Sequence, residues 1–119
     1  MKELIHVLHI SATRSWGGGE NHLVNLCHEL QNANGVKNTI LCAEGGLLDT
    51  RLRKMQMAHS TAPLAIKIDP RYLLKIGSIC RRNRIDLIHI HDSTALSLTV
   101  MADKFFSLPP FILSKKTSF

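Results

Sequence analysis

Short apolar runs alternate with segments of helical spacing along the chain. The runs are rich in Val, Ile and Leu, which is typical of strands buried on both faces. Between them, apolar residues recur every three or four positions, which is the spacing of an amphipathic helix. The pattern predicts strands at residues 4–10, 39–43, 62–68, 86–91 and 111–114, and helices at 20–33, after the Gly45-Gly46 turn, at 69–83 and at 95–106.

The same spacing predicts which side of each helix is buried. The expected apolar sides are Leu23, Leu26, Cys27 and Leu30 in the first helix, Leu48, Leu52, Met55 and His59 in the second, and Leu73, Ile76, Ile79 and Cys80 in the third. Asp69 and Pro70 are a helix N-cap and a first-turn proline. Pro63 removes a backbone donor from the third strand, which places that strand at or near an edge of the sheet.

The alternation of five strands with four helices predicts an α/β fold with a doubly wound, Rossmann-like parallel sheet. Right-handed crossovers place helices on both faces of such a sheet. With the strand order 3-2-1-4-5, the topological switch point lies between the first and fourth strands. Ligands bind at that point, outside the carboxyl ends of the strands. Residues 1–119 are enough for one such domain.

Three consecutive glycines follow the first predicted strand. Gly17, Gly18 and Gly19 leave backbone N–H groups bare for a ligand. The next helix begins at Glu20, and helix N-termini bind anionic and polyhydroxyl ligands readily. We expect a ligand-binding corner here, against the alternative of a flexible turn. Glu20 either complements the helix dipole or accepts hydrogen bonds from sugar hydroxyls, and Trp16 either covers the crevice or fixes the loop.

The fourth predicted strand ends in a polar segment on the same crevice. His91 lies at the strand exit, where a side chain reaches a ligand, and is the candidate functional imidazole. For Asp92 three roles stay open: orienting His91, capping the next helix with Ser93 and Thr94, or binding a ligand hydroxyl. His89 points to the same face of the strand and is expected to be a hydrogen-bonded interior histidine.

A metal site is the weaker interpretation of the seven histidines. His9 ends the first strand and is placed to approach His91 across neighbouring strands. However, His22, His28 and His59 have no ligand spacing with a carboxylate or a thiol, and no HExxH or Cys/His motif occurs. We therefore expect no metal.

The net charge of +6 and the pI of about 9.6 favour an acidic partner. Nucleic acid is disfavoured, because aromatic residues make up only 5% of the chain and no DNA or RNA motif occurs. Phosphate ligands and an anionic membrane surface remain. The basic residues that would form a lipid-binding surface, or else solvated helix faces, are Arg51, Arg53, Lys54, Arg81, Arg82 and Arg84.

The cysteines and the hydropathy pattern bear on the cellular compartment in which the protein is expected to work. Cys27, Cys42 and Cys80 are odd in number and lack CxxC spacing, which is typical of free thiols in a reducing environment. No apolar run approaches the length of about 18 residues that a membrane span needs, and the N-terminus has the pattern of a strand rather than of a signal peptide. We expect a cytoplasmic protein, with peripheral contact at the inner face of the membrane as an open alternative.

Four segments carry a likeness to one family. They are residues 7–10 leading into 17–20, the Glu44-Gly45-Gly46-Leu47-Leu48 segment, residues 86–93 with their D-hydrophobic-I-H-x-H pattern, and residues 112–119. In this order and spacing they resemble the N-terminal domain of GT-B glycosyltransferases of the family-4 type, a retaining group that uses nucleotide sugars. The resemblance spans nearly the whole chain.

The resemblance implies transfer of a sugar from a nucleotide-sugar donor to a glycan or lipid-linked acceptor, with retention, in cell-envelope polysaccharide biosynthesis. It implies no divalent metal and no cofactor besides the donor substrate. His91 becomes the catalytic-site residue that hydrogen-bonds the donor or acceptor. The residues that would contact the substrates or the donor phosphates in the cleft are Gly17, Gly18, Gly19, Glu20, Asp92 and Ser93.

Enzymes of this family have a second lobe, which holds most of the nucleotide and carries a paired-glutamate E-x7-E motif. These 119 residues contain no such motif. The chain is therefore expected to be a fragment of a larger enzyme, a truncated reading frame, or one half of a split two-chain transferase. The implied partner is a missing C-terminal lobe or a partner chain. Alone, the chain is expected to be inactive, because the catalytic cleft lies between the lobes.

Two other functions stay open. Gly17 and Gly19 match the first two glycines of a dinucleotide-binding fingerprint and Glu44 could hold a ribose, but His22 stands where the third glycine belongs. These residues leave NAD(P) binding as one alternative. The other alternative is a non-catalytic lobe that binds only an acceptor or a partner chain. A receiver-like signalling domain is excluded, because Ser11-Ala12-Thr13 supplies no acidic residue after the first strand.

Overall fold

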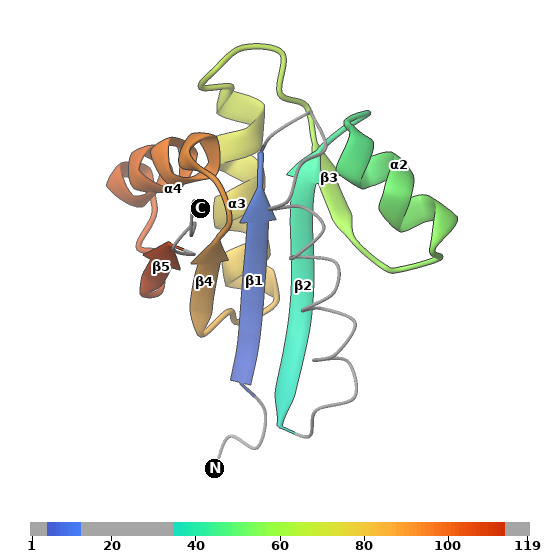
Figure 1. The fold of residues 1–119 in the computed structure, drawn as a ribbon. Helices are drawn as coiled ribbons and strands as arrows, with labels where there is room; N and C mark the ends of the chain where they lie inside the picture. The colour runs from blue at the N-terminus through green and yellow to red at the C-terminus, as the bar shows by residue number, and fades with distance from the viewer. Residues whose placement is uncertain (1–4, 13–34, 114–119) are drawn as a thin grey trace, which may run out of the picture.

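The structure, a computed structural model, describes residues 5–12 and 35–113. Strands and helices alternate through this part of the chain (Figure 1). The elements are β1 (Ile5–Ser11), β2 (Val36–Ala43), α2 (Leu47–Lys54), β3 (Ser60–Ala62), α3 (Pro70–Arg82), β4 (Leu87–Ile90), α4 (Ser93–Phe105) and β5 (Phe111–Leu113). The helix predicted at 20–33 lies outside the described residues.

The five strands form one parallel sheet in the order β3-β2-β1-β4-β5. The long strands β1 and β2 lie side by side at its centre (Figure 1), paired from Ile5 with Val36 to Ser11 with Cys42. On its other side β1 pairs with β4, so that His9 lies opposite His89. The predicted strand order is confirmed, and the switch point lies between β1 and β4 as expected.

Side chains alternate between two covered faces of the sheet. Leu8 and Ile10 of β1 belong to the larger core, which they share with residues of α3 and α4. Ile40 of β2 points to the opposite face and packs with Leu48 and Leu52 of α2. Helices therefore cover both faces, as predicted. His9 lies beside Ile40 in the strand register and so shares the face of α2.

The predicted boundaries of the second strand, the third strand and the second helix were wrong, and β2 begins at Val36 instead of residue 39. The third strand spans Ser60–Ala62 instead of 62–68, because Pro63 has no N–H to continue the ladder. It does lie at the sheet edge, as predicted. The second helix ends at Lys54, so Met55 is 42% exposed and lies outside the helix with His59. Leu48 and Leu52 are buried, which confirms that part of the predicted apolar side.

The third helix follows its sequence signals. The Asp69 carboxylate caps it by accepting a hydrogen bond from the Arg71 N–H at 3.0 Å, and Pro70 takes the first helical position. Hydrogen bonds from the Arg71 guanidinium and the Ala65 N–H hold the pKa of Asp69 well below its usual range. The predicted inward residues Leu73, Ile76 and Ile79 are buried.

None of the helices in the described ranges has the length and apolar character that crossing a bilayer requires.

Candidate functional site

The carboxyl ends of β1 and β4 are joined by one side chain, the carboxylate of Asp92. Its Oδ2 accepts hydrogen bonds from the Ser11 hydroxyl at 3.0 Å and from the Ala12 N–H at 2.9 Å. Its Oδ1 accepts from the Ala95 N–H at 2.7 Å, which caps α4. Asp92 thus fixes the end of the central strand against the start of a helix at the topological switch point.

These contacts bear on the roles that the sequence left open for Asp92. The capping role is the observed one, and the bonds to Ser11 and Ala12 add a contact to β1 that local sequence does not reveal. Both carboxylate oxygens already accept hydrogen bonds from protein groups. Ser93 begins α4 and is exposed. Ligand binding by Asp92 and Ser93 stays a prediction.

His91 follows β4 directly and is held at this same end of the sheet. Its backbone N–H donates to the carbonyl of Ile10 at 3.0 Å, which extends the ladder between β1 and β4 by one residue. Its side chain is half-buried, and its Nε2 lies 3.0 Å from Nδ1 of His9. The expected approach of these two imidazoles across neighbouring strands is therefore present.

His9 is the buried member of the pair, with 1% of its surface exposed. Its Nε2 lies 2.8 Å from Oδ1 of Asn38 on β2. Burial lowers the pKa of His9; the hydrogen bond to Asn38 opposes this effect, and the neighbouring His89 adds to it. The net shift is downward, so the His9 ring is neutral at neutral pH.

His89 completes a histidine cluster, the three rings of His9, His89 and His91. The ring centre of His89 lies 4.1 Å from that of His91 and 5.3 Å from that of His9. His89 is half-buried, so it is less interior than the sequence suggested. All three rings share one face of the sheet, because His9 and His89 are register partners and His91 follows two residues later.

Among the described residues, two groups each hold three potential metal ligands within 4.8 Å of one another. One is the histidine cluster, and the other is Cys42 with Asp49 and His59. Spacing along the chain conceals the second group, since its members come from different elements, whereas the approach of His9 to His91 was expected. In the histidine cluster, Nδ1 of His9 and Nε2 of His91 lie within hydrogen-bond distance of each other.

The second group is a structural joint between α2 and the segment that leads into β3. The Asp49 carboxylate accepts hydrogen bonds from Nε2 of His59 at 2.7 Å, from the Gly45 N–H at 2.9 Å and from Nε of Arg53 at 2.9 Å. Burial alone would raise the pKa of Asp49, but these hydrogen bonds outweigh it and the net shift is downward. Burial raises the pKa of the Cys42 thiol to about 12, so the thiol is protonated.

The backbone conformation of the turn at position 45 explains why this residue is glycine. Gly45 has a φ of +77°, a backbone conformation that side chains disfavour. This conformation aims its N–H at Asp49. Glu44, the candidate ribose ligand of the NAD(P)-binding alternative, is exposed beside this turn.

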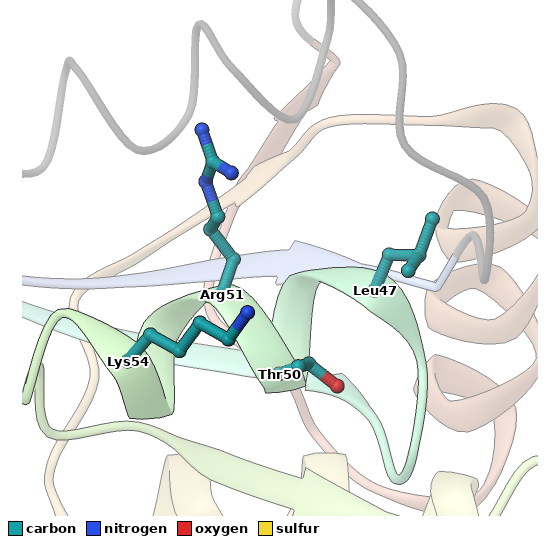
Figure 2. A pocket seen from close by; sticks show the side chains of 4 residues that line it. All are labelled: Leu47, Thr50, Arg51 and Lys54. Atoms are coloured by element: carbon teal, nitrogen blue, oxygen red, sulfur yellow. The ribbon is translucent and has the colours of Figure 1, made fainter.

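A surface pocket lies along α2. Its lining residues are Leu47, Thr50, Arg51 and Lys54. Figure 2 shows these side chains on α2, with that of Lys54 extended toward Thr50. His91, Asp92 and Ser93, the predicted site residues that the structure describes, are not among these four. Arg51 and Lys54 are exposed as predicted, whereas Arg53 is also paired with Asp49.

The described residues thus bring together one part of the predicted site. His91, Asp92 and Ser93 lie at the carboxyl end of β4, beside the end of β1. Gly17, Gly18, Gly19 and Glu20 fall outside the described residues, so their place in the crevice stays a prediction. Sequence reasoning missed Asn38, because an isolated polar residue before an apolar run resembles the end of a loop.

The fold resembles parts of larger solved structures. A glycosyltransferase from Rickettsia africae ESF-5 matches 98% of this chain with a TM-score of 0.72 at 18% identity, over 31% of its own length. Alr3699/HepE of Anabaena, in complex with UDP and glucose, matches 92% with a TM-score of 0.66 at 15% identity, over 29% of its length. MurG of Acinetobacter baumannii matches 97% with a TM-score of 0.67 at 14% identity, over 37% of its length.

At these identities the likeness establishes the fold alone, which is part of a GT-B structure. The chain spans about a third of the length of these proteins. No curated protein matches it in sequence. The model of Glycosyltransferase Family 4, however, matches residues 16–119, which is most of the chain. The chain therefore belongs to glycosyltransferase family 4.

Proposed function

We propose that this chain is the N-terminal, acceptor-side lobe of a GT-B glycosyltransferase. The reaction is transfer of a sugar, with retention, from a nucleotide sugar to a glycan or lipid-linked acceptor of the cell envelope. Family membership supports the transferase class. The Anabaena neighbour, solved with UDP and glucose, supports a nucleotide-sugar donor.

The observation that carries the proposal is the position of His91. Its imidazole lies at the carboxyl end of β4, next to the end of β1, and is half-buried. Ligands of doubly wound sheets bind at this switch point. In the proposed reaction His91 hydrogen-bonds a hydroxyl of the sugar or acceptor and is not a nucleophile.

The other cleft contacts are Gly17, Gly18, Gly19 and Glu20, with Asp92 and Ser93 on the facing side. Bare glycine N–H groups suit phosphate oxygens, and Glu20 suits sugar hydroxyls. Because Asp92 also fixes Ser11 and caps α4, its contribution to the cleft includes holding the β1 end in place.

The proposed partner is a second lobe or a partner chain that completes the cleft. Reacting groups must be held in near-attack geometry, and one wall of a two-walled cleft does not provide this. We propose that the chain is inactive alone, works in the cytoplasm, and contacts the inner face of the membrane when its acceptor is lipid-linked. Its net charge of +6 suits such an anionic surface.

A thermal-shift titration tests the proposal. The chain is titrated with UDP-, GDP- and ADP-sugars, with simple glycans and lipid phosphates, and with NAD and NADP. Stabilisation by a nucleotide sugar or an acceptor, lost in His91→Ala, is the expected result. A shift with NAD or NADP alone would contradict the proposal in favour of dinucleotide binding. No shift with any ligand would favour a non-catalytic lobe.

A further inference from the structure

We propose that Cys42, Asp49 and His59 form a binding site for a zinc ion. A sulfur, a carboxylate oxygen and a ring nitrogen from these residues all lie within 4.8 Å of one another. The sequence predicted no metal, because His59 has no ligand spacing along the chain. The fold supplies the proximity instead, since Cys42 lies in β2, Asp49 in α2, and His59 directly before β3. This inference does not depend on the proposed transferase function.

The spacing of the three ligand atoms is close to that of a tetrahedral ion. Zinc bonds to sulfur at about 2.3 Å and to nitrogen or oxygen at about 2.0–2.2 Å, which places neighbouring ligand atoms about 3.3–3.6 Å apart. Nε2 of His59 and Oδ1 of Asp49 lie 2.7 Å apart, and the whole group fits within 4.8 Å. Side-chain shifts of about 1 Å would therefore bring all three atoms to bonding distance.

Hydrogen bonds already orient the nitrogen and oxygen ligands. Nδ1 of His59 donates to the Met57 carbonyl at 2.9 Å, which is how ligating histidines commonly use their second nitrogen. A carbonyl only accepts, so the proton on Nδ1 is fixed and Nε2 is the nitrogen aimed at Asp49. The Gly45 N–H holds Oδ2 of Asp49 at 2.9 Å, which leaves Oδ1 on the side of His59.

Two contacts must give way to the ion, and both are weakly held. The Cys42 thiol reaches the Ser60 carbonyl at 3.9 Å, which is a long contact. Nε of Arg53 donates to Oδ1 of Asp49 at 2.9 Å, but the Arg53 side chain is 67% exposed and can turn toward water. The Asp49 side chain, at 3% exposed, stays in place.

The donor set selects the metal. Thiolate and imidazole ligands suit zinc, whereas Mg²⁺ and Ca²⁺ prefer oxygen ligands. On binding, the S–H bond of Cys42 and the Nε2–H bond of His59 break, bonds from sulfur and nitrogen to zinc form, and the protons go to solvent. The thiolate and the Asp49 carboxylate then balance the charge of Zn²⁺. The fourth tetrahedral position belongs to water.

Cobalt(II) replaces zinc as a visible probe of this site. The chelator-treated, reduced full chain is titrated with Co²⁺ and then with Zn²⁺. We expect one Co²⁺ per chain, the visible bands of a tetrahedral ion and a thiolate-to-cobalt charge-transfer band, all removed by Zn²⁺. Zinc should also raise the midpoint of thermal unfolding, because it joins β2, α2 and the segment before β3.

Substitutions then identify the ligands. Cys42→Ser and His59→Gln should each remove the charge-transfer band or weaken Co²⁺ binding by at least about 100-fold, since even partners outside the ligand set are worth about 10–100-fold. Cys80→Ser is the matched control, because Cys80 is a free thiol in α3 and not a member of the group. Cys27→Ser controls for the thiol that lies outside the described residues. Both controls should keep the bands.

Three results would overturn the proposal. The first is a folded wild-type chain that binds neither Co²⁺ nor Zn²⁺. The second is binding without a thiolate band, which would indicate the histidine cluster. The third is a band that survives Cys42→Ser in a chain with wild-type circular dichroism, or that is lost in Cys80→Ser or Cys27→Ser. If Cys42→Ser does not fold, the charge-transfer band of the wild type and its response to His59→Gln decide the proposal.

Discussion

The hydroxyl of Ser11 donates a hydrogen bond to the carboxylate of Asp92 at 3.0 Å. Ser11 is the last residue of β1, and Asp92 is the residue before α4. One bond therefore connects segments that are 81 positions apart in the sequence. Because Asp92 also caps α4, the end of the central strand and the first turn of the helix are fixed by the same side chain.

Asp92→Ala removes this connection and the cap together. Losing a helix cap costs about 1 kcal/mol, and the unpaired Ser11 and Ala12 donors add about 1 kcal/mol or more, so we expect the free energy of unfolding to fall by about 2–3 kcal/mol. Urea denaturation measures it. The control is Asp103→Ala, since Asp103 is exposed and accepts a longer bond of 3.3 Å from the Leu108 N–H. Equal losses in both variants would contradict the prediction.

Tyr72, the one tyrosine of the chain, should resist ionisation. It is fully buried, and its hydroxyl donates to the Ser11 carbonyl at 3.2 Å. Burial raises its pKa well above the ordinary value, with help from Cys42 and Asp92. The phenol therefore stabilises the fold below about pH 10, and this stabilisation is lost as the pH rises above that value.

We expect phenolate absorbance to appear only together with alkaline unfolding followed by circular dichroism. Phenolate formation in a chain that is still folded would contradict the prediction. Tyr72→Phe should abolish the signal and cost about 1 kcal/mol of stability through the lost hydrogen bond.

Gly77→Ala tests the contact between α3 and the end of α4. A Cβ at this position would lie 2.8 Å from atoms of the Phe106 ring, which packs against the core. Alanine gains about 0.5–1 kcal/mol in helix propensity, but crowding in a packed core costs about 1–3 kcal/mol. We expect a net loss of about 1 kcal/mol in thermal or urea unfolding. In a Phe106→Ala background the same substitution should be neutral or stabilising, and a loss that persists there would exclude the clash as its cause.

The thiols of Cys42 and Cys80 should be unreactive in the folded chain at neutral pH. Burial raises their pKa to about 12 and about 11, respectively, so the thiolate is scarce. Peptide mapping after iodoacetamide treatment should find both thiols largely unmodified without denaturant and fully modified in urea. Rapid alkylation of Cys42 at neutral pH without denaturant would contradict the assigned burial.

The strand order was predictable because it depends on features that the sequence states directly. Apolar runs and the capped start at Asp69 marked the elements, and crossover rules allowed few arrangements. The boundaries of β2 and β3 were not predictable from the sequence in this way. Lys37 and Asn38 have the character of loop residues, yet β2 begins at Val36 because its first residues pair with β1. Pro63 ended β3 earlier than its apolar neighbours suggested.

The candidate site was predictable only in part. Topology brought His9 and His91 together, since His9 lies near the carboxyl end of β1 and His91 directly follows the adjacent strand β4. The roles of Asn38 and Asp49 escaped prediction, because each depends on partners far away in the sequence. Asp49 in particular has the pattern of an ordinary charged helix residue, but it is 2% exposed. A buried hydrogen-bond network is a property of the tertiary fold and not of local spacing.

The sheet of the described residues is bounded by two strands of only three residues each, β3 and β5. Pro63 comes right after the first and Pro110 right before the second, and the Pro110 carbonyl is occupied by the Ile88 N–H at 2.9 Å. A second molecule approaching the β3 border would find a row of only three residues, followed by Pro63, which has no amide hydrogen. Strand-by-strand growth of fibrils from this border is therefore expected to be disfavoured.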